Sequence, residues 1–391
     1  MKQPGARDHR DSLLSDDLLG RIRARASGYD QDNVFPDADL RELAAAGYLA
    51  ALVPTELGGA GLSLLDATRE QARLATAAPA TALAVNMHLI WTGIAKALRD
   101  RGDNTLEYVL TEAASGEVFA FGISEPGNDL VLFDSTTDAR RQPDGSYAFT
   151  GTKIFTSLSP VWTRLGVFGL DSADAGRPQL VHAFLDRGGA GITTLDDWDT
   201  VGMRASQSNT TILDGALAAP GRVFGFRDPG PNADPLVFAI FANFEILLAS
   251  VYTGIAQRAL QLAVENASRR RSRKTGLPGS QNPDTRWKVA DAAIALDGLL
   301  PQLETLARDV DDLVDHGDQW FRKLTGLKLR ATENARFVVD QAVRVSGGSS
   351  YFTTSELGRL YRDVLAGGFH PSNEDSVHQT VATALLGPLE A

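Results

Sequence analysis

The sequence ISEPGND at residues 123–129, followed by YAFTGTKIFTS at 147–157, decides the fold of this chain. A turn rich in proline, glycine and asparagine cannot continue a helix, whereas the aromatic residues of the second stretch favour strands. Two short hydroxyl side chains, Ser124 and Ser157, therefore sit beside sheet edges, where they can donate hydrogen bonds to a flat heteroaromatic ring. Phe155 can supply a face for such a ring. Taken alone, this pattern is weak, because a hydroxyl in a turn more often closes the turn.

Composition excludes several classes of protein. The 391 residues are 43% hydrophobic, which is enough for a sizeable core in two or three layers or subdomains. The 38 basic and 49 acidic side chains give a net charge of −11, which argues against nucleic acid as a partner. Cysteine is absent, which excludes disulfides, thiolate nucleophiles and cysteine zinc sites, and we predict no metal site. We see no signal-peptide core and no apolar run of bilayer length, so we predict a cytoplasmic protein without membrane insertion.

The periodicity of apolar residues divides the chain into three parts. Residues 1–115 are predicted to be mainly helical, with a mostly apolar, buried helix at 81–98. Between 116 and 228 the period changes to two, and short strands are separated by Gly, Asp and Pro turns. Alternating helices and a Gly-x-Gly-x-x-Gly motif are both missing there, which argues against a Rossmann fold. Residues 229–391 contain three long amphipathic stretches and a shorter one from about Ser376, which predict a helical bundle.

Two groups of residues in the third part have the chemistry of phosphate binding. The sequence SGGSSYF at 346–352 ends the third long helix with Gly347 and Gly348. Arginine pairs with pyrophosphate oxygens, and glycine lets backbone amides approach them. From spacing alone the alternative is a solvated basic helix end and an ordinary glycine cap. The arginines that end the first long helix are Arg269, Arg270, Arg271 and Arg273.

These segments, in this order, resemble the acyl-CoA dehydrogenase superfamily. The stretch 123–157 is similar to the flavin-binding turn and strand of that family, and GMRAS at 202–206 is similar to its Gly-Met-Arg-x-Ser segment. In that segment Arg204 either offers hydrogen bonds to a ligand or pairs with Asp199. The resemblance implies FAD as the cofactor, with part of its pyrophosphate held by a neighbouring subunit. The implied flavin-binding residues are Phe121, Ser124, Asn128, Phe155, Ser157, Arg270, Gly347 and Gly348.

The same resemblance implies a complete architecture. We expect an α+β protein of the acyl-CoA dehydrogenase type, with an N-terminal α-helical domain at 1–115, a middle β domain at 116–228 and a C-terminal four-helix bundle at 229–391. FAD is expected between the β domain and the bundle. Because the pyrophosphate site is shared in this family, we expect a homotetramer built as a dimer of dimers, or a homodimer.

One departure from the family bears on the reaction. Typical members remove the α-proton of an acyl thioester with a glutamate that follows an Arg-Asp pair, and counting from Arg362 places that position at Pro371, which cannot accept a proton. Other members place the base near the start of the first bundle helix, where our count gives Phe244, with Glu245 adjacent. One residue of slip rotates a helical side chain by about 100°. Glu245 can therefore act as the base only if a gap or bulge re-aims it, and the alternative is an ordinary salt bridge.

Two histidines are consistent with a different reaction. Flavin-dependent monooxygenases of the same fold use reduced flavin and oxygen, often lack the glutamate, and carry histidines that line the flavin pocket. His370 and His88 fall where such histidines can lie, and a neutral imidazole can accept a substrate proton. The alternatives are a hydrogen-bonded core histidine for His88 and a helix-terminal histidine that binds backbone carbonyls for His370.

Three hypotheses of function follow. The first is an FAD-dependent acyl-CoA dehydrogenase-like oxidoreductase that desaturates an acyl thioester, expected to be an acyl-CoA, and passes electrons to a partner. The second is a reduced-flavin-dependent monooxygenase, and the third is a non-catalytic protein that binds flavin or an acyl thioester. The turn at 125–129 is two residues shorter than in the family, and Asn128 replaces a serine that contacts flavin and substrate. The mouth of an acyl-CoA channel would therefore be altered.

Overall fold

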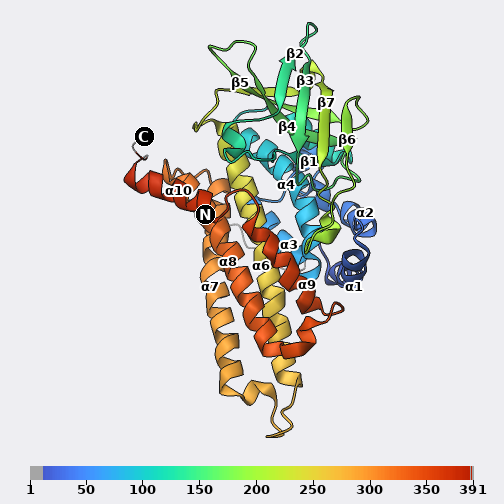
Figure 1. The fold of residues 1–391 in the computed structure, drawn as a ribbon, viewed down its shortest axis with the longest axis vertical. Helices are drawn as coiled ribbons and strands as arrows, with labels where there is room; N and C mark the ends of the chain where they lie inside the picture. The colour runs from blue at the N-terminus through green and yellow to red at the C-terminus, as the bar shows by residue number, and fades with distance from the viewer. Residues whose placement is uncertain (1–11, 388, 390–391) are drawn as a thin grey trace.

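Helices and strands occupy separate parts of the chain, as the hydrophobic periodicity predicts. The structure is a computed structural model that describes residues 12–387 and Leu389. Residues 1–11, in which we looked for a signal sequence, lie outside the described residues. A sheet lies at one end of the molecule and the long helices extend away from it (Figure 1).

Five helices precede the sheet. Their starts follow the capping rules: the Ser15 side chain accepts a hydrogen bond from the Leu18 amide, and the Ser63 side chain accepts one from the Asp66 amide. The loop between the second and third helices is rich in glycine and proline, as the sequence predicts. The helices are α1 (Asp16–Asp32), α2 (Asp37–Ala45), α3 (Leu64–Ala77), α4 (Pro79–Arg99) and α5 (Glu107–Ala114).

The middle part forms one eight-stranded sheet in the order β6-β7-β3-β2-β4-β5-β8, with β1 paired to β4. Most neighbours are antiparallel, whereas β1 and β2 each run parallel to β4. The strands are β1 (Phe119–Gly122), β2 (Asp138–Arg141), β3 (Tyr147–Lys153), β4 (Arg164–Asp171), β5 (Gln179–Asp186), β6 (Ile192–Thr194), β7 (Thr211–Ala218) and β8 (Val223–Arg227).

The third part is a helical bundle. The first long helix, α6, runs without interruption for 35 residues and ends at the predicted arginine cluster. The second continues through Pro301. The helices are α6 (Pro235–Arg269), α7 (Pro283–Asp311), α8 (Gln319–Ser346), α9 (Glu356–Asp363) and α10 (Glu374–Leu386). Periodicity did not predict α9, which is only eight residues long.

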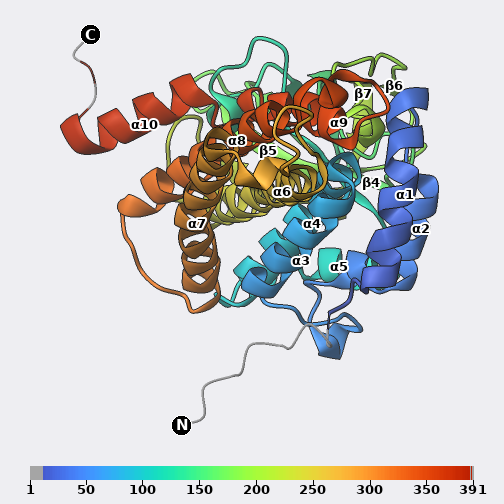
Figure 2. The same ribbon diagram turned by 90° about the horizontal axis from the view of Figure 1, so that it is seen from below.

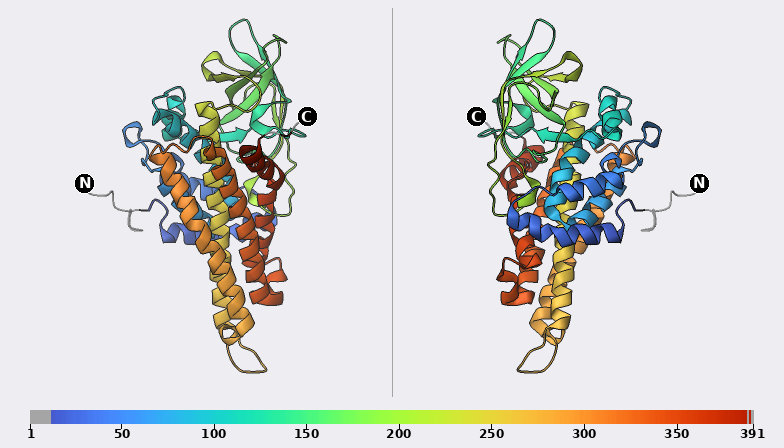
Figure 3. Two further views of the ribbon diagram at one scale, coloured as in Figure 1. Left: turned by 90° about the vertical axis from the view of Figure 1, so that its left-hand side faces the viewer. Right: turned by 90° about the vertical axis from the view of Figure 1, so that its right-hand side faces the viewer.

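Helix α6 is the axis of the molecule. It packs against α3, α4, α7 and α8, and Figure 2 shows it surrounded by these four helices. The side views place the sheet at one end and the far ends of α6 and α7 at the other (Figure 3). By length and composition α6 could cross a membrane, which corrects our expectation that no apolar run is long enough. However, 89% of its most apolar window is buried inside the protein, so α6 is a core helix.

Candidate active site

A cavity of about 420 Å³ lies where the sheet meets the bundle. Its walls come from α4, β1, the loop after β3, the segment before Arg204, α6, and the segment after α9. Residues distant in the sequence therefore meet at one place. The lining residues are Leu83, Met87, Phe121, Ser124, Phe155, Ser157, Trp198, Asp199, Thr200, Val201, Gly202, Met203, Ser208, Phe244, Arg362, Leu365, Ala366, Phe369, His370 and Pro371.

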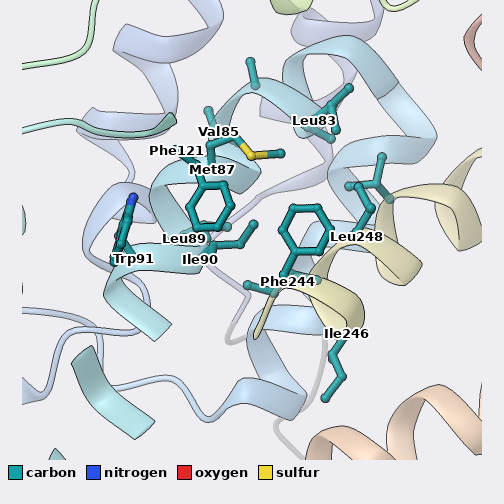
Figure 4. Close-up of a cluster of buried hydrophobic side chains, with 14 of the residues drawn as sticks. Leu83, Val85, Met87, Leu89, Ile90, Trp91, Phe121, Phe244, Ile246 and Leu248 are labelled. Atoms are coloured by element: carbon teal, nitrogen blue, oxygen red, sulfur yellow. The ribbon is translucent and has the colours of Figure 1, made fainter. Parts of the chain in front are cut away.

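One wall is apolar. The rings of Phe121 on β1 and Phe244 on α6 are stacked with centroids 5.7 Å apart. Met87 and Leu83 lie beside them on α4, as Figure 4 shows. Behind this wall, the Trp91 indole donates a hydrogen bond of 2.9 Å to the carbonyl of Ala120 and so fixes the end of β1. The wall is thus preformed and suited to a flat aromatic ligand.

Another part of the lining carries hydroxyl groups. The Ser157 and Ser208 oxygens are 2.8 Å apart, and the Ser208 and Ser206 oxygens are also 2.8 Å apart. The predicted hydroxyls Ser124 and Ser157 both reach the cavity, and sequence reasoning missed Ser208. Hydroxyls rotate to donate or accept, so this row can adapt to either kind of ligand atom.

Phe155 is presented by an unusual backbone. The expected strand at 147–157 ends at Lys153, and Phe155 has a φ of 57°, in the left-handed region that residues other than glycine rarely adopt. Its ring is 50% exposed and packs edge-on against Trp198, with centroids 6.1 Å apart. The local strain turns an aromatic face toward the cavity mouth, where a regular strand would have placed the side chain differently.

The turn after β1 is held by a buried ion pair. The Lys153 ammonium donates a hydrogen bond of 2.5 Å to the Glu125 carboxylate, and both side chains are completely buried. Burial disfavours the ionised carboxylate, but Lys153 and the hydroxyls of Ser135 and Thr137 outweigh it and lower the pKa of Glu125 to about 2. Asn128 belongs to the same turn, and its side-chain amide donates hydrogen bonds to the Glu125 carboxylate and to the carbonyl of Asp134. Asn128 therefore stabilises the turn and does not line the cavity.

The end of α9 is anchored to the segment before Arg204. The Asp363 carboxylate accepts a 2.7 Å hydrogen bond from the Met203 amide, and Arg362 pairs with Asp30 and donates to the carbonyl of Val201. Gly202 approaches this segment so closely that a Cβ atom there would lie 2.2 Å from the Arg362 carbonyl oxygen. The Arg-Asp pair singled out in the sequence thus anchors the cavity wall.

Arg204 does not line the cavity. It pairs with Asp199 at 2.8 Å, which confirms the salt-bridge alternative, and donates a second hydrogen bond to the carbonyl of Asp30. Asp199 is the one carboxylate among the described residues that line the cavity, and its side chain is 84% exposed. A buried carboxylate positioned to remove a substrate proton is therefore missing from this part of the described structure.

Glu245 lies outside the cavity, contrary to the expectation that it could reach the substrate. Helix α6 has no bulge here, so Phe244 faces the cavity and Glu245 points about 100° away. Glu245 instead accepts a hydrogen bond from the Ser372 hydroxyl. Burial raises the pKa of Glu245, and the charge of Lys328 partly opposes this shift.

The two histidines have different surroundings. His370 lines the cavity, and its Nε2 atom is 2.8 Å from the Tyr252 hydroxyl. Burial, together with the nearby charge of Lys328, lowers the pKa of His370 to about 3, so the ring is neutral at physiological pH. His88 is fully buried: its Nε2 is 2.7 Å from the Leu49 carbonyl, and its Nδ1 accepts a hydrogen bond from the Phe119 amide. His88 is thus a core residue of α4 and does not line the cavity, whereas Pro371 does.

The predicted phosphate-binding residues lie together. Arg270 follows the last residue of α6 and donates a 3.1 Å hydrogen bond to the Ser346 carbonyl. A Cβ atom on Gly347 would lie 2.8 Å from the Arg270 guanidinium, which shows how closely the two residues approach, and Gly348 follows directly. At 1.5 Å per residue, this cluster is about 39 Å along α6 from Phe244. Arg270 and the cavity therefore lie at opposite ends of one helix.

Comparison with known proteins assigns the class. The family description "Acyl-CoA dehydrogenase, N-terminal domain" matches residues 18–117, and "Acyl-CoA dehydrogenase, C-terminal domain" matches residues 246–374. Together with the helix–sheet–bundle architecture, these matches show that the chain belongs to the acyl-CoA dehydrogenase superfamily. The fold predicted from the sequence is confirmed.

The similar proteins include enzymes of more than one reaction. The amino sugar nitrososynthase DnmZ of Streptomyces peucetius is 30% identical over 374 residues, covering 91% of this chain and 89% of that protein. A structure of KijD3 in complex with FMN and dTDP-3-amino-2,3,6-trideoxy-4-keto-3-methyl-D-glucose has a TM-score of 0.86 at 28% identity, covering 99% of this chain and 96% of that one. Butyryl-CoA dehydrogenase from Megasphaera elsdenii also has a TM-score of 0.86, with 20% identity over 99% of this chain and 100% of that one, and shows the shared fold.

Proposed function

We propose that this chain is a flavin-dependent monooxygenase of the acyl-CoA dehydrogenase fold that oxidises the amino group of a sugar substrate. The proposal rests on the cavity wall at His370 and Pro371, because the count from Arg362 puts the catalytic glutamate of a typical dehydrogenase at Pro371. The similarity to an amino sugar nitrososynthase and to the FMN complex of KijD3 supports the same reaction class. This similarity favours our second hypothesis, a reduced-flavin-dependent monooxygenase, over the first, acyl-CoA dehydrogenation.

The lining of the cavity fits the ring of a flavin. Phe121 and Phe155 offer aromatic faces, and Ser124, Ser157 and Ser208 offer hydroxyls that can hydrogen-bond to the polar edge of the ring. Reduced flavin, when bound, supplies the two electrons and two hydrogens with which O₂ gives one oxygen atom to the substrate and one to water. The apolar wall around Phe244 limits the access of water to this chemistry.

His370 is suited to handling the proton of the substrate. A sugar amine must lose a proton before nitrogen can accept an oxygen atom, and a neutral imidazole can accept that proton. Burial keeps His370 neutral and free to accept a proton, but it also disfavours the protonated ring, so His370 acts as a weak base; Tyr252 holds its Nε2 atom. His370 is therefore our candidate catalytic residue, and its neighbour Pro371 has no group that can take a proton.

We propose that a second copy of the chain contributes to the binding of FAD. Arg270, Gly347 and Gly348 lie about 39 Å along α6 from the cavity wall, farther than one extended FAD molecule reaches. Their arginine and close-packed glycines suit a pyrophosphate. They would thus serve the cavity of a neighbouring subunit in a homodimer or homotetramer, whereas FMN, which lacks the adenosine half, would use the cavity alone.

The test compares two reactions of the purified protein. In the first, reduced FMN or FAD, oxygen and a dTDP-linked amino sugar are mixed, and the loss of the amine is followed by mass spectrometry. In the second, the flavin-loaded protein is mixed without oxygen with acyl-CoAs of several lengths, and flavin absorbance is followed. Oxidation of the amine without bleaching by any acyl-CoA is expected. Bleaching by an acyl-CoA, with no amine oxidation, would establish a dehydrogenase instead and end the proposal.

A further inference from the structure

A buried lysine binds the chain segment that carries His370. Lys328 on α8 is completely buried, and its ammonium group donates hydrogen bonds to the carbonyls of Gly367, His370 and Ser372 at 3.0, 3.3 and 3.0 Å. An ammonium group has three donors, so all three are used within six residues of one segment. We call residues 367–372 the His370 segment.

The His370 segment packs tightly on two bundle helices. A Cβ atom on Gly367 would lie 2.8 Å from the Thr332 side chain on α8 and 3.0 Å from the Tyr252 ring on α6. Only glycine permits this approach, which brings the segment within reach of both Lys328 and Tyr252. The side chain of His370 then bonds to Tyr252. Helix α8 thus fixes the backbone of the His370 segment, and α6 fixes the imidazole ring.

Ser372 ends the His370 segment in a strained conformation that hydrogen bonds with Lys328 and Glu245 stabilise. Its φ is 57°, a value that residues other than glycine rarely adopt. Its carbonyl accepts from Lys328, while its hydroxyl donates to Glu245. Strain of this kind persists only where the surroundings determine the backbone from several sides. Glu245 therefore binds the side-chain hydroxyl of Ser372, and Lys328 binds its backbone carbonyl.

Burial acts on the charges of both Lys328 and Glu245. A buried ammonium group is costly unless a nearby anion and good hydrogen bonds compensate, and an apolar side chain of similar length would avoid that cost. Of the groups that act on the charge of Lys328, Glu245 is buried and Glu333 is exposed, and both favour the charged lysine. Burial lowers the pKa of Lys328 and raises that of Glu245. Burial thus favours the neutral form of Glu245, which sequence reasoning considered as a base and which acts on this segment through the Ser372 hydroxyl.

We propose that Lys328 is a positioning residue: by binding three carbonyls of the His370 segment, it fixes the His370 imidazole at the cavity wall, while Glu245 binds the Ser372 hydroxyl of the same segment. The role of His370 in oxidation rests on the function proposed above. The positioning itself does not, since it is a property of the protein without flavin or substrate.

The test measures hydrogen–deuterium exchange of residues 364–373 in the full-length protein without flavin. In Lys328→Met, a side chain of similar length without donors, these amides should exchange at least about tenfold faster, because three hydrogen bonds are lost. The matched control is Lys323→Met, a change on the same helix at a lysine that makes no hydrogen bond with the His370 segment. It should leave the exchange of 364–373 within twofold of the unaltered protein.

A second readout separates positioning from general stability. With reduced flavin, oxygen and amino sugar, Lys328→Met should release several-fold more hydrogen peroxide per substrate oxidised, while the KM for flavin changes less than twofold. If Lys328→Met does not fold, Lys328→Met combined with Glu245→Gln, which removes both ionisable groups, replaces it in the same measurements. Unchanged exchange of 364–373 in a folded variant would overturn the proposal. Faster exchange in a protein that oxidises no amine would support positioning while rejecting the proposed function.

Discussion

The Nε2 atom of His370 lies 2.8 Å from the hydroxyl of Tyr252, so a residue of the core helix α6 orients the imidazole at the cavity wall. The Tyr252 ring is completely buried, and burial raises its pKa well above the usual value, so the phenol stays protonated. Because His370 is neutral as well, this contact is a hydrogen bond between two neutral groups. Because a hydroxyl can donate to Nε2 or accept from it, the bond fixes the orientation of the ring in either tautomer.

Replacing His370 should reveal its part in the reaction. His370→Gln removes the proton acceptor, so turnover of an amino sugar should fall by about 100-fold or more, as expected for the loss of a general base. Tyr252→Phe, which leaves the imidazole but removes its partner, should cost about tenfold or less. Both are measured as kcat with reduced flavin and oxygen. Equal turnover in His370→Gln and the unaltered protein would show that His370 is not the base.

The ion pair between Glu125 and Lys153, in the turn after β1, should be a main source of stability. Glu125→Gln leaves the buried Lys153 ammonium without its anion, so the free energy of unfolding should fall by about 3–5 kcal/mol. Adding Lys153→Met removes the uncompensated charge and should recover part of the loss. Urea unfolding followed by circular dichroism measures both. The control is Arg140→Met, which breaks an ion pair between exposed side chains and should cost no more than about 1 kcal/mol.

The low pKa of Glu125 predicts how the free energy of unfolding depends on pH. The pKa of Glu125 is about 2 in the folded protein and 4.5 for an unperturbed glutamate, so folding favours the ionised form. Its contribution, about 3 kcal/mol, is fully present above pH 4.5 and is lost as the pH falls towards 2. Stability measured between pH 5 and pH 2.5 should therefore fall less steeply in the double variant Glu125→Gln, Lys153→Met. Parallel slopes in the two proteins would contradict the assignment of the low pKa to Glu125.

Arg270 should distinguish the two flavins. If Arg270 of a neighbouring copy binds the pyrophosphate of FAD, Arg270→Ala should weaken FAD binding by about tenfold or more, since hydrogen bonds between charged groups are lost. FMN binding should change little, because FMN does not reach this cluster. Fluorescence titrations with each flavin give the two dissociation constants. Arg271→Ala is the control, since Arg271 donates only to the carbonyl of Gly276 in its own loop.

Much of the architecture was accessible from the sequence because it depends on local rules. The change from helical to alternating periodicity near residue 116 marks the start of the sheet, and Ser63 caps α3 as a serine before a helix does by local rules. The contact of Arg270 with the Ser346 carbonyl, next to Gly347, follows from two helix ends that the bundle brings together. Such features need only the chain and the family order of its motifs.

The parts that were missed depend on how elements rotate and pack. Whether Phe244 or Glu245 faces the cavity depends on the rotation of an uninterrupted helix about its axis. One residue of misalignment turns the side chain by about 100°. The sequence analysis did not single out Lys328, because a sequence does not show that three carbonyls of another segment will surround a lysine on an amphipathic helix. The left-handed backbone at Phe155 was likewise invisible, since local propensity there favours a strand.

Helix α6 links two functions that lie far apart in each copy of the chain. Phe244 near its start borders the cavity, while Arg270 directly follows its end. If neighbouring copies complete one another's sites, a mutation at either end damages a different set of sites in the assembly. With FAD as the cofactor, a protein altered at His370 and one altered at Arg270, each impaired alone, would then regain partial activity when their subunits are mixed.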